Sequence, residues 1–64
     1  MKSRDIIKTL KKAGWVEVRQ SGSHKQFRHP DRKGTVTVPH PSSDMAMGTI
    51  KSIEKQSGVK LRQS

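Results

Sequence analysis

The sequence predicts an α+β domain in which a helix, three antiparallel strands and a second helix follow one another along the chain. Apolar residues recur with helical spacing in residues 3–13, alternate with polar residues between 15 and 39, and return to helical spacing from 45 to 58. A chain of 64 residues is too short for two cores, so residues 1–64 should form one domain. Both helices are expected on one face of the sheet, because only one face is apolar.

The first helix is expected to begin at Ser3, whose hydroxyl can cap it, and to end before Gly14. Ile6, Ile7 and Leu10 form one apolar stripe along it. The rest of the chain offers few other residues for a core. The stripe therefore favours packing on the sheet over lying on a membrane.

The first strand is expected in residues 15–20, where alternation places Val16 and Val18 on the buried side. Trp15 then lies on the other side, at the rim of the core, where it packs or stacks on a base. A two-residue turn, Gly22-Ser23, leads into the second strand.

The register of these two strands follows from the turn length. A two-residue turn pairs apolar with apolar side chains and joins opposite charges, whereas a three-residue turn juxtaposes like charges. The expected pairs are Val18 with Phe27, Glu17 with Arg28, and Arg19 with Gln26.

The third strand is expected in residues 35–39, after a turn-rich stretch at 30–34. Val36 and Val38 should face the core, with Val38 opposite Phe27. Because Pro39 lacks an N–H group, this strand should be an edge of the sheet and should end there.

The second helix is expected in residues 45–57, ended by Gly58. Met47, Ile50 and Ile53 should face inward. Residues 59–61 can fold back onto the helix end, and residues 62–64 are expected to be a frayed tail.

Charge is the strongest global signal in the sequence. Fourteen lysines and arginines against five acidic residues give a net charge of +9. Such an excess favours a polyanionic partner, which can be nucleic acid, an anionic membrane or an acidic protein. The longest apolar run is three residues, too short for a transmembrane span or a signal peptide, so a cytoplasmic protein is expected. The absence of cysteine excludes disulfides and thiolate chemistry.

The face of the sheet opposite the helices, here called the open face, should carry Arg19, Ser21, His24, Gln26 and Arg28. His24 is the main candidate on it, although a solvated histidine without a role is the plainer interpretation. Cleavage of RNA by its own 2′-OH needs one proton removed, one delivered, and stabilisation of the crowded phosphate. A histidine beside cations such as Lys25 and Arg28 can supply such a proton transfer and that stabilisation without a metal.

Other candidates have weaker support. His29 should pack on the helix-covered side, and His40, between two prolines, can contact RNA or act as a second acid or base. The three histidines should lie on different faces, so no metal site is expected. Lys51, near the start of the second helix, can bind phosphate, while the small residues beside it equally suit helix packing.

Several motifs together resemble one known family. "GW" after the first helix, "R-x-x-GSH" ending at His24, "FRHP", "GTVTVPHP" and "GTIKSI" stand in order and at matching spacing over almost the whole chain. They resemble the HicA, or YcfA-like, toxins. The resemblance implies a fold like the double-stranded-RNA-binding domain and a metal-independent mRNA interferase of a type II toxin–antitoxin pair, which needs no cofactor, blocks translation and growth, and is neutralised by a HicB-type antitoxin.

In that family the histidine of the GSH block is catalytic, and this role maps onto His24. Many relatives carry a second histidine next to it, where this chain has Lys25. The contacts expected for phosphate or RNA are Lys25, Arg28, Arg19, Ser23, Gln26 and Lys51.

Two other functions stay open at this point. The same basic face suits an RNA-binding module without catalysis. It also suits binding of an acidic protein, for which the antitoxin is the obvious candidate and which can cover His24.

Overall fold

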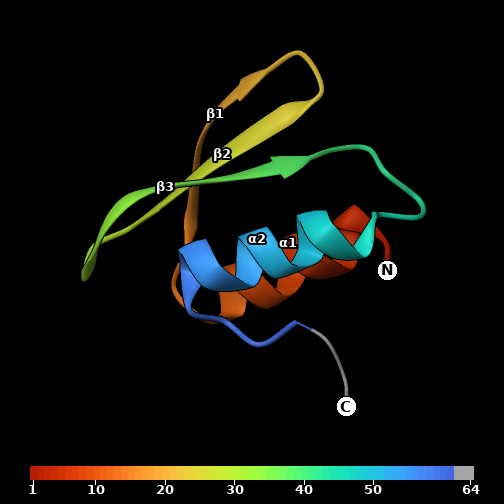
Figure 1. Cartoon of the computed structure of the whole chain (residues 1–64). Coiled ribbons are helices and arrows are strands. Elements are labelled where there is room, and N and C mark those ends of the chain that lie inside the picture. The colour runs from red at the N-terminus through yellow and green to blue at the C-terminus, as the bar shows by residue number, and fades with distance from the viewer. Residues whose placement is uncertain (62–64) are drawn as a thin grey trace.

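The computed structural model describes residues 1–61, which form one sheet with two helices on one side (Figure 1). The elements are α1 (Ser3–Lys12), β1 (Val16–Ser21), β2 (His24–His29), β3 (Arg32–Pro39) and α2 (Met47–Ser57). The α-β-β-β-α order and the single helix-covered face confirm the predicted fold. The predicted tail at 62–64 lies outside the described residues. No helix within residues 1–61 is long and apolar enough to span a membrane.

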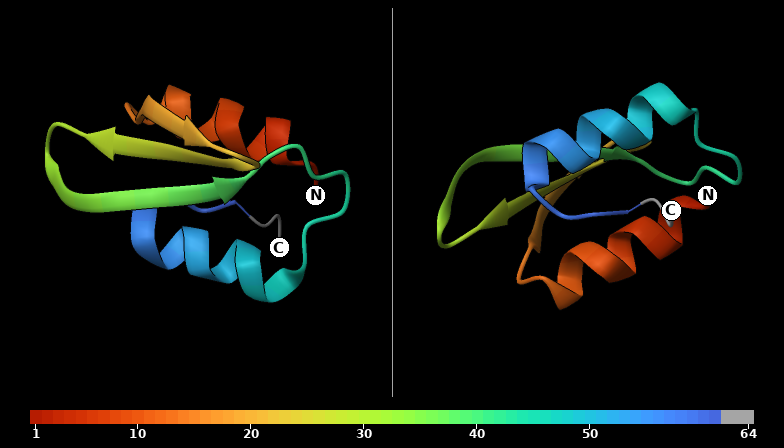
Figure 2. Two further views of the ribbon diagram at one scale, coloured as in Figure 1. Left: turned by 90° about the horizontal axis from the view of Figure 1, so that it is seen from above. Right: turned by 60° about the horizontal axis from the view of Figure 1, so that its bottom comes forward.

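The sheet is antiparallel in the order β1-β2-β3, so β2 is the central strand and β3 is an edge, as predicted. Seen from above in Figure 2, both helices lie behind the sheet and leave its other face uncovered. β3 begins at Arg32, three residues earlier than expected, because a tight turn at Pro30 and Asp31 already reverses the chain. Phe27 lies opposite Val36 rather than Val38.

The pairing of β1 with β2 confirms the two-residue turn but only part of the expected register. Ser21 lies opposite His24 and Arg19 opposite Gln26, as predicted. A β-bulge between Glu17 and Arg19 then inserts Val18 as an extra residue. The predicted pairs of Val18 with Phe27 and of Glu17 with Arg28 are therefore wrong, since Phe27 faces Glu17 and Arg28 faces Val16.

The bulge also reverses the predicted faces of residues 15–17, whereas Arg19 stays on the open face. Val16 and Val18 are 56% and 54% exposed, whereas Trp15 is buried at 2%. Trp15 packs edge-on against His29, with ring centroids 5.3 Å apart. The expected packing role of Trp15 is therefore confirmed, inside the core rather than at its rim, and the buried indole excludes the alternative of stacking on a base.

The core lies between the sheet and the helices. Its buried apolar residues are Ile6, Ile7, Leu10, Trp15, Phe27, Val36, Val38, Met45, Ile50, Ile53 and Leu61. In α2 the inward residues Ile50 and Ile53 match the prediction, but Met47 is 54% exposed because α2 starts two residues later than expected. Met45, in the preceding loop, is buried instead.

The ends of the helices differ in how well they were predicted. Gly58 ends α2 in the left-handed conformation, as expected. Ser3 is not the N-cap of α1, since Lys2 occupies that position and Ser3 is the first helical residue. The Ser3 side chain is buried and bonds to the loop after β3 instead. Beyond Gly58 the chain runs back between the helices and buries Leu61, as predicted (Figure 2).

We expect Val36→Ala to cost about 2 kcal/mol of unfolding free energy, because it opens a cavity in the core beside Phe27. Val18→Ala deletes the same atoms at an exposed position and should cost no more than about 0.5 kcal/mol. Urea unfolding of both variants measures the difference. Equal losses would mean that β1 buries its valines.

Candidate functional site

The central strand β2 sends its side chains alternately to the two faces of the sheet. Phe27 is buried under the helices, while His24 and Arg28 are exposed on the opposite side, with Gln26 between them half-buried. This places His24, Gln26 and Arg28 together on the open face, as expected. The alternation of one strand thus separates the packing residues from the candidate site.

His24 lies at the start of β2, between Ser21 on β1 and Pro39 on β3. Its imidazole is exposed, and no side chain or backbone group within residues 1–61 forms a hydrogen bond or ion pair with it. Both ring nitrogens therefore face solvent and are available to a ligand. A histidine held in this way can exchange protons with a bound molecule.

Two arginines accompany His24 on the open face. Arg19 lies opposite Gln26 and is thus the diagonal cross-strand neighbour of His24. The Cα atoms of such diagonal neighbours are about 7–8 Å apart. Arg28 lies four residues from His24 along β2, a rise of about 13 Å. Both are exposed, and neither has an ion-pair partner in the part of the chain that the structure describes. Of the two arginines, Arg19 therefore lies nearer to His24.

Lys25 lies on the other face of β2. Its ammonium group is 3.0 Å from Glu17 Oε2 and 2.9 Å from Gln20 Oε1. Glu17 is also the only acidic residue in the three strands. Glu17 therefore compensates the charge of Lys25 on the helix side. The strands contribute no carboxylate to the open face.

Gln26 is oriented by a residue that the sequence analysis did not single out. Thr37 Oγ1 donates a hydrogen bond of 2.8 Å to Gln26 Oε1. The Gln26 amide N–H groups keep no partner within residues 1–61, so they are available as donors between Arg19 and Arg28. The signal for Thr37 was present in "TVTVP", where the threonines alternate with the buried valines.

His29 has a structural role, as expected. Its Nδ1 accepts a hydrogen bond of 3.0 Å from the Asp31 N–H group, and its Nε2 lies 3.0 Å from the Ala13 carbonyl oxygen. Since a carbonyl oxygen only accepts, the ring proton is on Nε2. Both nitrogens are thus used to join the β2–β3 turn to the end of α1.

His40 is half-buried, and its Nδ1 lies 2.8 Å from Ser3 Oγ at the start of α1. This contact lies on the helix side, since α1 covers that face. His24 is on the open face, so the two side chains point to opposite faces of the sheet, although the His40 backbone lies next to the turn that precedes His24.

The remaining candidates lie at different places. Ser23 is exposed in the turn just before His24, and its carbonyl oxygen accepts a hydrogen bond from the His40 N–H group. Lys51 is exposed on α2, on the far side of the sheet from His24. Within residues 1–61 no three His, Asp or Glu side chains converge in a way that could hold a metal ion.

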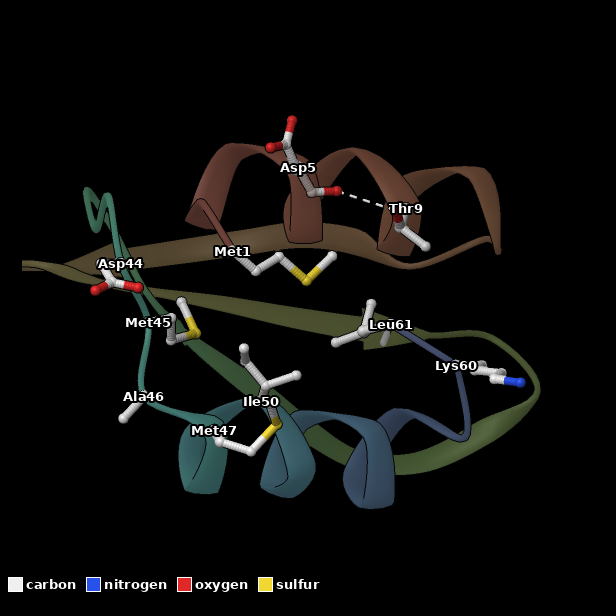
Figure 3. A pocket seen from close by; sticks show the side chains of 10 residues that line it. All are labelled: Met1, Asp5, Thr9, Asp44, Met45, Ala46, Met47, Ile50, Lys60 and Leu61. Carbon is white, nitrogen blue, oxygen red and sulfur yellow. Dashed lines mark hydrogen bonds between the residues drawn. The ribbon is translucent and has the colours of Figure 1, made fainter. Parts of the chain in front are cut away.

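A separate groove lies between α1 and α2 (Figure 3). All three methionines of the chain line it, together with Ile50 and Leu61. Flexible thioethers fill irregular space well, which suits a gap between two helices. The groove lies on the helical side of the sheet and is distinct from the open face.

The family model for the HicA toxin of bacterial toxin–antitoxin systems matches residues 3–59. The chain belongs to the HicA toxin family. A solved HicA3 and HicB3 toxin–antitoxin complex contains a chain that is 32% identical, with a TM-score of 0.84. The match covers 97% of this chain and 100% of that one, so the HicA fold accounts for nearly every residue here. Comparison with curated proteins finds no significant match.

Proposed function

We propose that this HicA-family chain is a metal-independent endoribonuclease, an mRNA interferase that cuts mRNA in the cytoplasm and so blocks translation and growth. The observation that supports this most is the exposed His24 imidazole on a cationic face, with neither ring nitrogen bonded within residues 1–61. Membership of a toxin family supports a growth-blocking role.

In the proposed reaction the 2′-OH of one nucleotide attacks the adjacent phosphorus. The O2′–P bond forms and the P–O5′ bond breaks, giving a 2′,3′-cyclic phosphate and a 5′-OH end. His24 removes the proton from O2′ or delivers one to O5′, and water supplies the complementary transfer. Proton transfer by one positioned histidine typically contributes about 100- to 10,000-fold in rate.

The arginines act on the phosphates in this proposal. Arg19, the diagonal neighbour of His24, offsets the charge that develops on the non-bridging oxygens of the reacting phosphate. Arg28 lies further from His24 along β2, and we assign it to a neighbouring phosphate of the same RNA strand. Gln26 donates to the backbone between them, whereas Lys25, paired with Glu17, contributes indirectly by holding β1 against β2.

The open face is also the surface where we expect a protein partner to bind. Because the similar solved structure is a complex of HicA3 with HicB3, we propose that a HicB-type antitoxin binds this chain and covers His24. An acidic antitoxin surface would complement Arg19 and Arg28 and speed the encounter. Growth should therefore resume when the antitoxin gene is expressed together with the toxin.

The test is incubation of the purified chain with a defined mRNA in excess chelator. We expect cleavage products that end in 2′,3′-cyclic phosphate, and we expect added HicB-type antitoxin to suppress them. Gel mapping and mass spectrometry of the ends measure both results.

Salt-sensitive RNA binding without any product would favour the non-catalytic RNA-binding module. If the chain binds the antitoxin but has no affinity for RNA, the remaining function is binding of an acidic protein. Products with 3′-OH and 5′-phosphate ends would exclude the attack by the 2′-OH.

A further inference from the structure

A buried hydroxyl joins the start of α1 to the loop that follows β3. Ser3 is 2% exposed, and its Oγ accepts a hydrogen bond of 2.9 Å from the Ser42 N–H group. The same Oγ lies 2.8 Å from His40 Nδ1, and the Ser3 N–H group donates to the Ser42 carbonyl oxygen at 2.8 Å. Three hydrogen bonds around one residue thus fix the loop onto the helix.

The same loop also holds the turn that carries His24. The His40 N–H group donates a short hydrogen bond of 2.7 Å to the Ser23 carbonyl oxygen, and Pro39 lies opposite His24 in the sheet. His40 is therefore bonded on two sides, through its ring to α1 and through its backbone to the turn. It connects the start of α1 to the residue immediately before His24.

We propose that His40 is a positioning residue for His24, rather than a second acid or base. This rests on the proposed ribonuclease function. The His40 ring is bonded to Ser3 at the start of α1, on the helix side, while the His24 side chain lies on the open face, so the two rings point to opposite faces of the sheet. His40 can act on His24 by fixing its position. The bond of the His40 ring to Ser3 holds in place the His40 N–H group that donates to the Ser23 carbonyl oxygen.

Geometry at this position matters for the reaction. A general acid or base must lie within hydrogen-bond reach of its proton, and a misplacement of about 1 Å can cost about a hundredfold in rate. The turn of residues 22 and 23 protrudes beyond the helices, where the strand ladder alone would restrain it (Figure 1). The bond from His40 supplies the additional restraint.

The experiment compares His40→Asn with His40→Ala. An asparagine amide can occupy the place of the imidazole Nδ1 and keep the bond to Ser3, but it cannot transfer a proton at neutral pH. We expect His40→Asn to keep kcat within about threefold of wild type, with the same pH profile. His40→Ala should lose about ten- to a hundredfold in kcat with little change in KM. Assays are run well below the melting temperature of each variant.

Two further variants separate positioning from general loss of stability. Ser3→Ala removes the hydrogen bond between Ser3 and His40 from the Ser3 side and should lower kcat as His40→Ala does. The variant that combines Ser3→Ala with His40→Ala should lose no more kcat than either single variant. Ser43→Ala changes an exposed serine of the same loop and should behave like wild type. Loss of activity in His40→Asn equal to that in His40→Ala would overturn the proposal, as would full activity in both.

Hydrogen exchange gives a readout that does not need RNA. The His40 amide should be protected in wild type and in His40→Asn, and should exchange faster in His40→Ala. If the wild-type chain does not cleave RNA, the ribonuclease proposal fails whatever this measurement gives. If it cleaves RNA but the His40 amide exchanges equally in all three chains, the positioning proposal alone fails.

Discussion

The His24→Gln chain is expected to cleave mRNA about 100- to 10,000-fold more slowly than the wild-type chain. Glutamine keeps a polar side chain of similar length but cannot accept and release a proton at neutral pH. Because the imidazole is exposed and has no bond to break within residues 1–61, the fold and the unfolding free energy should change by no more than about 0.5 kcal/mol. Rates are measured at saturating RNA in chelator, and stability is measured by urea unfolding.

Binding must be measured with the same variant, because loss of affinity alone would mimic loss of catalysis. RNA affinity should stay within about threefold of wild type, since the proposed phosphate contacts of Arg19 and Arg28 are unchanged and should supply most of the electrostatic attraction. Lys33→Gln, which removes an exposed positive charge on β3, is the matched control and should keep its cleavage rate. Cleavage by His24→Gln at the wild-type rate would exclude His24 from the chemistry. A loss of affinity as large as the loss of rate would make it a binding residue.

The fold could be predicted because apolar residues recur at a clear spacing in most of the helices and strands. The helical spacing of Ile6, Ile7 and Leu10 and the alternation of Val36 and Val38 each leave one arrangement that buries apolar surface. The exception is β1, where both faces carry apolar side chains. Trp15 has far more apolar area to bury than Val16, so the face with Trp15 turns inward.

That choice also explains the bulge. With Trp15 inward, Glu17 falls on the helix side, where it meets Lys25. Val18 becomes the extra residue, which lets Arg19 keep its place opposite Gln26 on the open face. Alternation alone gives no signal for a bulge, because the change of register depends on contacts with another strand.

The candidate site was predictable next to the turn and less so away from it. The two-residue turn fixes the pairs nearest to it, so His24, Gln26 and Arg19 were placed correctly before the bulge intervenes. The ion pair of Lys25 and the bond between His40 and Ser3 were not predictable, because each joins residues whose proximity depends on the assembled fold. The catalytic role of His24 stays a prediction that the variants above test.

Gly14→Ala is expected to cause a large loss of stability for a single added methyl group. Gly14 has φ of +98°, and a Cβ there would lie 2.7 Å from His29 Nε2. The left-handed backbone costs an alanine about 1–2 kcal/mol. Moving the His29 ring also weakens its bonds to Ala13 and Asp31, at about 1 kcal/mol each. The total of about 3–4 kcal/mol is a large part of the about 3–10 kcal/mol that stabilises a domain of this size.

Gly34→Ala separates the two causes. Gly34 has φ of +89°, but a Cβ there meets nothing within 4 Å, so alanine at this position adds only the backbone strain. The effect of the substitution on the unfolded chain is the same in both variants and cancels in the comparison. Gly14→Ala should therefore melt at least about 5 °C below Gly34→Ala, measured by circular dichroism or calorimetry. Equal melting temperatures would mean that the His29 ring moves aside freely, and that its two hydrogen bonds do little to hold the β2–β3 turn against α1.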